Sequence, residues 1–267
     1  MRVVVLGDAH LIADDDPYKR LHEVRGFFKC AWPSFKSLIE LINSSSPDLV
    51  VMLGDLVDWF SRENISFGLE LMSKLKAPWK MTPGNHDLAA PTGYASQEVY
   101  KTEANPGHAS YWIHEGVESS NRVINEDGLR LILMDSPLSY VHPGTQYWLG
   151  EVLCCDTHNI LFTHVSIDTP ETREYILAVD ANKSMKKYVL SGAPNLYGRV
   201  LRGRIDSVFS AHLHFSGQLR VDSSEFHLCD MSISMRDPNR NSSCRATAYL
   251  LDWDSKQCRT TSLVVTE

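Results

Sequence analysis

The sequence predicts an α/β fold, and two features of the chain support this class. Short β-branched and aliphatic runs at residues 3–6, 49–53 and 160–162 have the composition of buried strands. Helix-like stretches at residues 35–43 and 65–75 separate the early runs, so the first half alternates strand and helix. This order is typical of a parallel sheet, and ligands of such sheets bind beyond the carboxyl ends of the strands.

Polar residues that can bind metals follow these predicted strands. The three apolar runs each lead directly into a segment with an aspartate or a histidine, and two further segments of this kind lie elsewhere in the chain. The candidate residues are Asp8, His10, Asp55, Asp58, Asn85, His86, His164, His212 and His214. We expect them to gather at one edge of the fold, because the carboxyl ends of parallel strands share that edge.

The chemistry of this set favours metal binding. Carboxylates, imidazoles and an amide oxygen suit divalent or trivalent transition ions, and paired cysteines that would indicate a structural zinc site are missing nearby. Asp55 could bridge two cations, since a carboxylate has two oxygens and two-metal hydrolytic centres space their ions about 3.5–4 Å apart. Glycines before Asp8, Asp55 and Asn85 would let the backbone turn sharply or approach closely. The sequence therefore predicts a hydrolytic centre with two metal ions.

The five segments resemble the calcineurin-like metallophosphoesterase superfamily, whose pattern runs D-x-H, G-D-x-x-D, G-N-H-D/E, a lone His and G-H-x-H. The resemblance spans residues 8–214. It implies one metal ion held by Asp8, His10, Asp55 and His214, and a second held by Asp55, Asn85, His164 and His212. It also implies that His86 stays off the metals and protonates the leaving oxygen, with Asp58 orienting its imidazole and Asp87 in a supporting role.

Two positions depart from the common family pattern, and two others narrow the subfamily. Thr163 and Ala211 stand where the family often has glycine, and both are small enough for the ligands to survive. Purple acid phosphatases carry a tyrosine in place of Asp58, and Ser/Thr protein phosphatases carry an arginine in place of Trp59. The chain therefore looks most like the small bacterial phosphodiesterases, including the class III cyclic nucleotide enzymes.

This resemblance implies a four-layer α/β/β/α sandwich of two mixed sheets flanked by helices, with residues 1–267 as one domain. The implied reaction is hydrolysis of a phosphodiester, such as a cyclic nucleotide or another small diester, by a hydroxide activated between Mn, Fe or Zn ions. Two alternatives remain open: a phosphomonoesterase with the same metals, and a metal-binding scaffold without catalysis. Residues 218–221, 225–228, 246–252 and 260–264 predict late antiparallel strands in a second sheet.

Composition restricts the partners. The formal charge is −7 over 267 residues, so no broad basic surface favours nucleic acid, and the expected partner is a small phosphate ester. No apolar stretch approaches the ~20 residues of a membrane span. Six cysteines without C-x-x-C spacing fit reduced thiols, which makes a cytoplasmic location the expectation.

Several residues near the motifs have a simpler interpretation. The acidic run at residues 14–16 is expected to be a solvated loop, and His22 a surface or structural residue. Packing in the core is favoured over base stacking for Trp59. A structural role is favoured for His142, although its loop could reach the pocket, and Arg199 could hold a phosphate oxygen.

Overall fold

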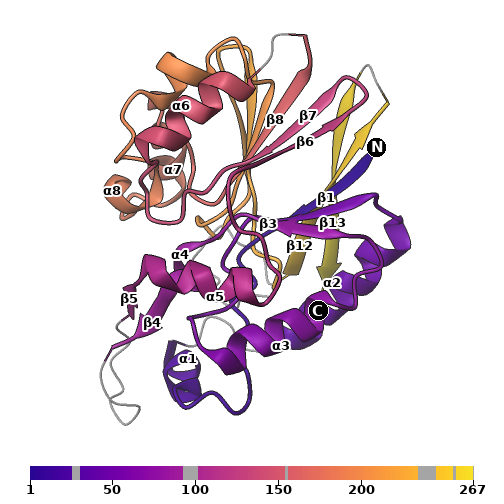
Figure 1. The fold of residues 1–267 in the computed structure, drawn as a ribbon, viewed down its shortest axis with the longest axis vertical. Helices are drawn as coiled ribbons and strands as arrows, with labels where there is room; N and C mark the ends of the chain where they lie inside the picture. Colours follow the sequence, from indigo (N-terminus) through magenta and orange to yellow (C-terminus); the bar gives the residue numbers. More distant parts are fainter. Residues whose placement is uncertain (26–30, 93–101, 154–155, 234–244, 255–256, 267) are drawn as a thin grey trace.

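The computed structural model describes residues 1–25, 31–92, 102–153, 156–233, 245–254 and 257–266. Two sheets pack face to face, and helices cover both outer faces (Figure 1). This is the four-layer α/β/β/α arrangement implied by the family resemblance.

The first sheet has the strand order β13-β12-β1-β2-β3. Its strands are β1 (Arg2–Leu6), β2 (Leu49–Met52), β3 (Trp79–Met81), β12 (Arg245–Trp253) and β13 (Cys258–Thr266). The first three run parallel, whereas β12 is antiparallel to both β1 and β13. Helices α1 (Lys19–Arg25), α2 (Ala31–Ser45) and α3 (Arg62–Met72) follow β1 and β2 in the chain. Along β1, Val4 packs in a cluster with α2 and α3, and its neighbour Val5 packs against the second sheet, as the two-residue period of a strand requires.

The second sheet has the order β10-β11-β9-β8-β7-β6. Its strands are β6 (Arg122–Glu126), β7 (Leu129–Leu133), β8 (His158–Thr163), β9 (Ser207–Ser210), β10 (Gly217–Val221) and β11 (Ser224–Leu228). Phe162 and Phe209 stack on the face toward the first sheet, while Leu161 and Val208 pack outward with α6 (Pro143–Val152) and the turn η2 (Tyr197–Leu201). Helices α7 (Pro170–Val179) and α8 (Met185–Tyr188) lie on this side of the molecule (Figure 1).

A separate two-stranded sheet of β4 (Ala89–Pro91) and β5 (Thr102–Ala104) lies next to α4 (Asn85–Leu88), at the lower left of Figure 1. Helix α4 precedes it, and the turn η1 (Pro106–His108) and helix α5 (Ala109–His114) follow. Trp112 of α5 is buried and donates to the carbonyl oxygen of Asp87 at 2.9 Å, which fixes α5 against α4.

The late strands differ from the expectation in one respect. All four form, and they pair as antiparallel hairpins, but the two hairpins do not share a sheet. The β10–β11 hairpin extends the second sheet beside β9, and the β12–β13 hairpin completes the first sheet beside β1. The hydrophobic pattern identified the strands but carried no information about their distant partners.

Cys229 and Cys258 are free thiols, in agreement with the expectation, and the other four cysteines lie outside the described residues. None of the helices in the described part of the chain has the length and apolar character needed to cross a bilayer.

Candidate metal centre

Nine residues predicted from the sequence gather where the parallel strands of both sheets end. From the first sheet, the segment after β1 brings Asp8 and His10, the segment after β2 brings Asp55 and Asp58, and α4 after β3 brings Asn85 and His86. From the second sheet, His164 follows β8, and His212 and His214 follow β9. The centre is thus assembled from both sheets, and His212 N donates to Asp8 Oδ2 across them at 2.8 Å.

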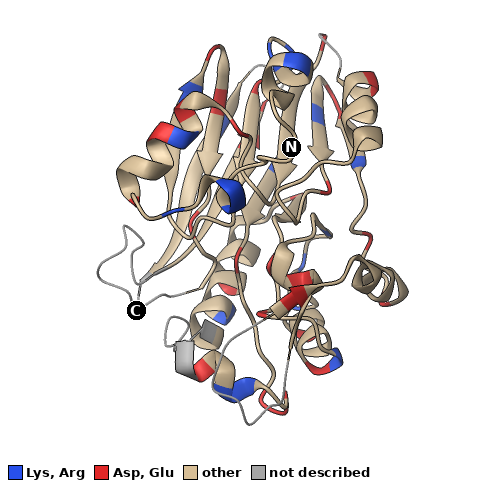
Figure 2. Ribbon diagram, turned by 90° about the vertical axis from the view of Figure 1, so that its left-hand side faces the viewer, with Lys and Arg blue, Asp and Glu red and all other residues tan. Residues whose placement is uncertain are grey.

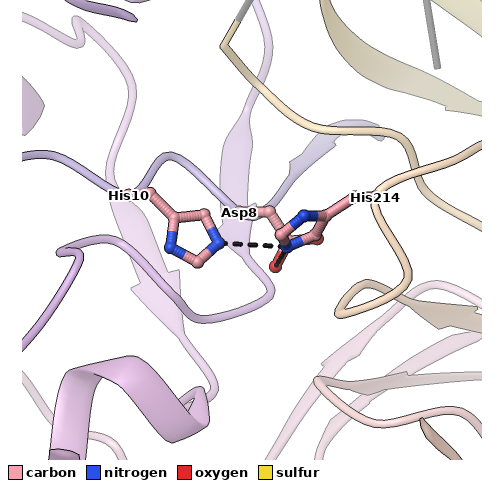
Figure 3. A group of neighbouring side chains, drawn as sticks. All are labelled: Asp8, His10 and His214. Carbon is pink, nitrogen blue, oxygen red and sulfur yellow. Dashed lines mark hydrogen bonds and ion pairs between the residues drawn. The ribbon is translucent and has the colours of Figure 1, made fainter. Parts of the chain in front are cut away.

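The first group consists of Asp8, His10 and His214, whose ligand atoms all lie within 4.8 Å of one another. Figure 3 shows the two imidazoles turned toward each other, with their Nε2 atoms 3.1 Å apart. Asp8 Oδ1 lies 3.9 Å from His214 Nε2. Three nitrogen and oxygen ligand atoms therefore face one point.

The second group consists of Asp55, His164 and His212, again within 4.8 Å. His164 Nε2 lies 3.1 Å from His212 Nδ1, 3.2 Å from Asn85 Oδ1 and 3.4 Å from Asp55 Oδ2. Asp55 Oδ2 is also 3.7 Å from His10 Nε2, in the first group. Asp55 therefore connects the two groups, which is the position expected of a bridging carboxylate.

Buried oxygens without hydrogen-bond partners support a fit to cations. Asp8 Oδ1 and Asp55 Oδ2 are buried and accept no hydrogen bond. An unsatisfied buried carboxylate oxygen is costly, and such groups normally coordinate metals or pair with charges. Among the buried side-chain atoms without partners in the described residues, the two carboxylate oxygens both belong to predicted ligands, so the donor set fits metal ions.

The backbone of the centre is strained. Five of the predicted ligands have positive φ: Asp8 at 54°, His10 at 44°, Asp55 at 52°, His212 at 69° and His214 at 61°. Among non-glycine residues this conformation is uncommon, and each instance costs on the order of 1–3 kcal/mol. Strain of this kind persists where the surrounding structure enforces it, and it is concentrated at functional sites.

The glycines predicted to allow close approach do so at Gly54 and Gly84. Gly54 has a φ of +87°, and a Cβ there would lie 2.3 Å from the backbone nitrogen of Gly84. A Cβ on Gly84 would lie 2.1 Å from Asp55 Oδ1. The loops that carry Asp55 and Asn85 therefore touch backbone to backbone, which only glycine permits.

Asp87 joins the loops that carry Asp55 and Asn85. It is fully buried, and its Oδ2 accepts from the backbone nitrogens of Asp55 and Gly84, both at 2.8 Å. Its Oδ1 accepts from Leu56 N at 2.9 Å and Val57 N at 3.3 Å. One carboxylate thus satisfies four backbone donors and joins the two loops, as its predicted supporting role requires.

Asp58 contacts three histidines, and this differs from the expectation. Its Oδ1 lies 3.1 Å from His10 Nδ1, and its Oδ2 lies 2.8 Å from His22 Nδ1. His86 Nδ1 instead donates to the backbone carbonyl of Asp58 at 2.6 Å, and it lies 3.5 Å from Oδ1. Asp58 therefore orients His86 mainly through its carbonyl oxygen, and its carboxylate orients His10.

Sequence reasoning missed His22. It lies in α1, is buried, and stacks on Trp32 with ring centroids 5.7 Å apart. The sequence spacing between His22 and the motifs does not indicate this contact, because α1 approaches Asp58 through tertiary packing.

Hydrogen bonds to backbone carbonyl oxygens determine which nitrogen of His164 and of His212 faces the centre. His164 Nδ1 donates to the carbonyl oxygen of Leu53 at 2.7 Å, which leaves Nε2 toward the centre. His212 Nε2 donates to the carbonyl oxygen of Lys187 at 3.1 Å, which leaves Nδ1 toward the centre. Such partners are typical of metal-binding histidines, since they fix the ring and its tautomer.

Burial and the two carboxylates shift the pKa values of the histidines in opposite directions. Burial lowers the pKa of His10 to about 4 and that of His212 to about 3. Burial also opposes charge on His164, but the carboxylates of Asp55 and Asp8 outweigh it and raise its pKa to about 9. Burial raises the pKa of Asp8 to about 7. The raised pKa of His164 reflects the negative charge of the two carboxylates, and that charge also favours a bound cation.

A cavity of about 440 Å³ opens beside the second group. Asn85 and His212 line its metal side, the β4–β5 hairpin and the loop at residues 137–139 form its walls, and Lys186 and Lys187 of α8 line the rest. In Figure 2, α8 is the short blue helical turn near the middle of the molecule. The two lysines carried no signal in the sequence, because adjacent lysines are usually solvated surface residues.

The remaining candidates have structural roles or lie away from this cavity. Trp59 is fully buried and donates to Asp16, so core packing is confirmed and Asp16 is not a solvated residue. His142 caps α6 by accepting from Gly144 N at 3.1 Å, and it lines a neighbouring cavity of about 200 Å³. Arg199 is exposed on η2 and is not among the described residues that line either cavity.

The fold and this cluster define a metal-centred α/β protein, with ligands from two packed sheets. A sequence model of the calcineurin-like phosphoesterases matches residues 1–216, and the chain belongs to this family. The family binds two divalent metal ions, and membership implies a phosphoric ester hydrolase. No curated protein matches the chain in a sequence comparison.

Solved structures share the fold at low sequence identity. A dimetal phosphatase from Danio rerio is 12% identical with a TM-score of 0.60, over 100% of this chain and 98% of that chain. Phosphopantetheinyl hydrolase from Mycobacterium tuberculosis is 15% identical with a TM-score of 0.58, over 86% and 89%. A purple acid phosphatase from yellow lupin is 12% identical with a TM-score of 0.58, over 98% of this chain and 51% of that chain.

Proposed function

We propose that this protein is a two-metal phosphodiesterase that hydrolyses a small phosphodiester, such as a cyclic nucleotide. The observation that carries the proposal is the position of Asp55. Its buried Oδ2 has no hydrogen-bond partner and lies 3.7 Å from His10 and 3.4 Å from His164, one residue from each ligand group. A carboxylate in this position can serve two cations.

We assign the ligands from these distances. One ion would be held by Asp8, His10, Asp55 and His214, and the other by Asp55, Asn85, His164 and His212. Mn, Fe and Zn ions, all divalent or as a mixed-valence pair, suit this mixture of nitrogen and oxygen donors. When bound, such a pair supplies Lewis acidity toward the phosphoryl oxygens and lowers the pKa of a shared water.

His86 is assigned as the general acid. The distances alone would also allow it to act as a ligand, because it lies with His10 and Asp55 within 4.8 Å. Exposure does not separate the two roles, because the side chain of His86 is 14% exposed and that of the predicted ligand His214 is 16% exposed, so the assignment follows the family resemblance. The Asp58 carbonyl holds Nδ1, so Nε2 is the nitrogen that would protonate the departing oxygen.

The cavities beside the predicted metal ligands support a diester as the substrate. A diester must place two organic groups, one that leaves and one that stays on phosphorus. The cavity of about 440 Å³ borders Asn85 and His212, and it shares Pro137 and Leu138 with the neighbouring cavity of about 200 Å³. The larger cavity offers an organic group space directly beside the predicted ligands, and the smaller one adjoins it.

The test compares bis-p-nitrophenyl phosphate with p-nitrophenyl phosphate as substrates of the Mn-supplemented protein. His86→Ala is the test variant, and His114→Ala, an exposed histidine at the end of α5, is its matched control. Faster turnover of the diester that is lost only in His86→Ala supports the proposal. Preference for the monoester would indicate a phosphomonoesterase, and a protein that binds metal yet cleaves neither substrate would indicate a scaffold.

We further propose that residues 1–267 act as one domain, that the partner is a small phosphate ester rather than nucleic acid, and that the protein resides in the cytoplasm. The formal charge of −7 and the six cysteines without C-x-x-C spacing support these points.

A further inference from the structure

Lys186 and Lys187 form a basic patch on the cavity beside the metal centre. Both line the cavity that Asn85 and His212 also line, and both side chains are exposed. Neither ammonium group forms an ion pair with any residue of the described part of the chain. Two cations without partners are therefore available to a molecule that enters this cavity.

The backbone of α8 is tied to the metal centre, so the patch has a defined position. The carbonyl oxygen of Lys187 accepts from His212 Nε2 at 3.1 Å and also from Ser139 Oγ at 2.6 Å. One contact joins α8 to a predicted metal ligand, and the other joins it to the opposite wall of the cavity. The backbone that carries the two lysines is thus held beside the predicted metal ligands.

The rest of the cavity is mostly apolar, with Thr102 and Ser139 as its polar members. The β4–β5 hairpin contributes Ala89 and Ala104, and the loop across from it contributes Pro137 and Leu138. Leu138 is 43% exposed, so its side chain is accessible to a molecule in the cavity. An organic group could occupy the space between the metal ligands and α8.

The charge of the patch exceeds what a simple diester requires. Two divalent cations are balanced largely by the carboxylates of Asp8 and Asp55, the nucleophile and the single charge of a phosphodiester. Two additional ammonium groups match additional negative charge on the ligand, and lysine is a common phosphate-binding residue that acts as a point charge.

We propose that Lys186 and Lys187 bind a second anionic group of the substrate, separated from the scissile phosphoryl group by an apolar spacer. The second group is a phosphoryl group or a carboxylate, which share the required chemistry. The inference depends on the proposed function in one point, because it takes the metal ligands as the place where the scissile phosphoryl group binds.

The test measures binding of three phosphonates that the protein cannot hydrolyse. They share one phenyl body: phenylphosphonate, 4-phosphonobenzoate and benzene-1,4-diphosphonate. Titration calorimetry of the Mn-loaded full chain gives each Kd, for the natural sequence, for the double variant K186Q/K187Q and for K36Q, an exposed lysine on α2. Exposed ion pairs contribute about 0.2–1 kcal/mol each, so two lysines should tighten binding of a probe with two anionic groups by roughly 2- to 30-fold.

The expected result is tighter binding of at least one probe with two anionic groups than of phenylphosphonate. The ratio of the two Kd values should fall to about one in K186Q/K187Q and be retained in K36Q. Preference for the diphosphonate alone would identify a second phosphoryl group, and preference for the benzoate a carboxylate. The inference is overturned if the natural sequence shows no preference, if the preference survives K186Q/K187Q, or if that variant weakens all three probes equally.

The two proposals can fail separately. Turnover of bis-p-nitrophenyl phosphate without any preference among the phosphonates would overturn the anion site and leave the phosphodiesterase proposal in place. Preference among the phosphonates without turnover of any ester would support the anion site and contradict the catalytic proposal.

Discussion

Replacement of Asp87 by asparagine should destabilise the protein and also lower its metal content. The carboxylate accepts four backbone N–H groups at 2.8–3.3 Å, two on each oxygen. Asparagine has one oxygen and one NH2 group, so in either orientation two donors face another donor. Those donors belong to the loops that carry Asp55 and Asn85.

The magnitude follows from the number of donors that lose an acceptor. A buried donor left without a partner costs about 1–3 kcal/mol, so two of them predict a loss of roughly 2–6 kcal/mol in the free energy of unfolding. Domains of this kind are stable by only about 5–15 kcal/mol, so the loss would be a large fraction of the total. Asp87→Ala, which removes all four acceptor contacts, should cost more.

Urea denaturation of the metal-free protein measures the stability, and elemental analysis after Mn loading measures the metal content. Asp14→Asn is the matched control, because Asp14 is 85% exposed and forms a surface ion pair with Lys19. That pair is worth at most about 1 kcal/mol. If Asp87→Asn unfolds within about 1 kcal/mol of the natural sequence and retains its metal, the proposed support of the two loops by Asp87 is wrong.

Three further predictions concern the histidines around the centre. His86→Ala should lower kcat by roughly 10²–10⁴-fold with nearly full metal content, whereas Asp55→Ala should lose both, and equal metal loss in the two variants would contradict their separate roles. The pKa of His164 is raised from 6.5 to about 9 in the metal-free cluster, so protonated His164 stabilises that state below pH 6.5 and the contribution is lost as the pH rises through 9. Stabilisation by added Mn, measured as the shift in Tm, should therefore grow from pH 6.5 to 9; a shift independent of pH would contradict this. His22→Ala should lower kcat several-fold by removing the imidazole that contacts Asp58 Oδ2, and His22→Gln, which keeps a donor, should recover part of it; equal kcat values in both variants would argue against an orienting hydrogen bond.

The sequence was a good guide to the strand ends because local patterns encode them. A buried strand shows as an apolar run, and the glycine and polar residues just after it mark where the chain turns into the site. Asp8, Asp55 and His164 could be placed in this way before any contact was known, and Gly54 indeed adopts the positive φ that its position suggested. The side chains with the strongest local signal therefore had the most accurate predictions.

Contacts made through tertiary packing carried no such signal. His22 reaches Asp58 from 36 positions away along the chain, and Lys187 contacts His212 from 25 positions away through its backbone. The late hairpins likewise were recognised as strands, but β12 pairs with β1 across almost the whole chain. Periodicity reports which face of an element is buried, and it does not report which distant element covers that face.

The position of the centre has a consequence for stability as well as for chemistry. Asp8, His10, Asp55 and Asn85 come from the first sheet, whereas His164, His212 and His214 come from the second. Hydrogen bonds cross between the two sets of residues here, such as those from His212 N to Asp8 and from His164 Nδ1 to Leu53. Ions shared by both sets would act as cross-links that bind the folded state but not the unfolded chain, and such binding stabilises the fold by mass action. The same ions would offset the cost of five strained ligand residues, which explains how a backbone so unfavourable in isolation can persist at the junction of the two sheets.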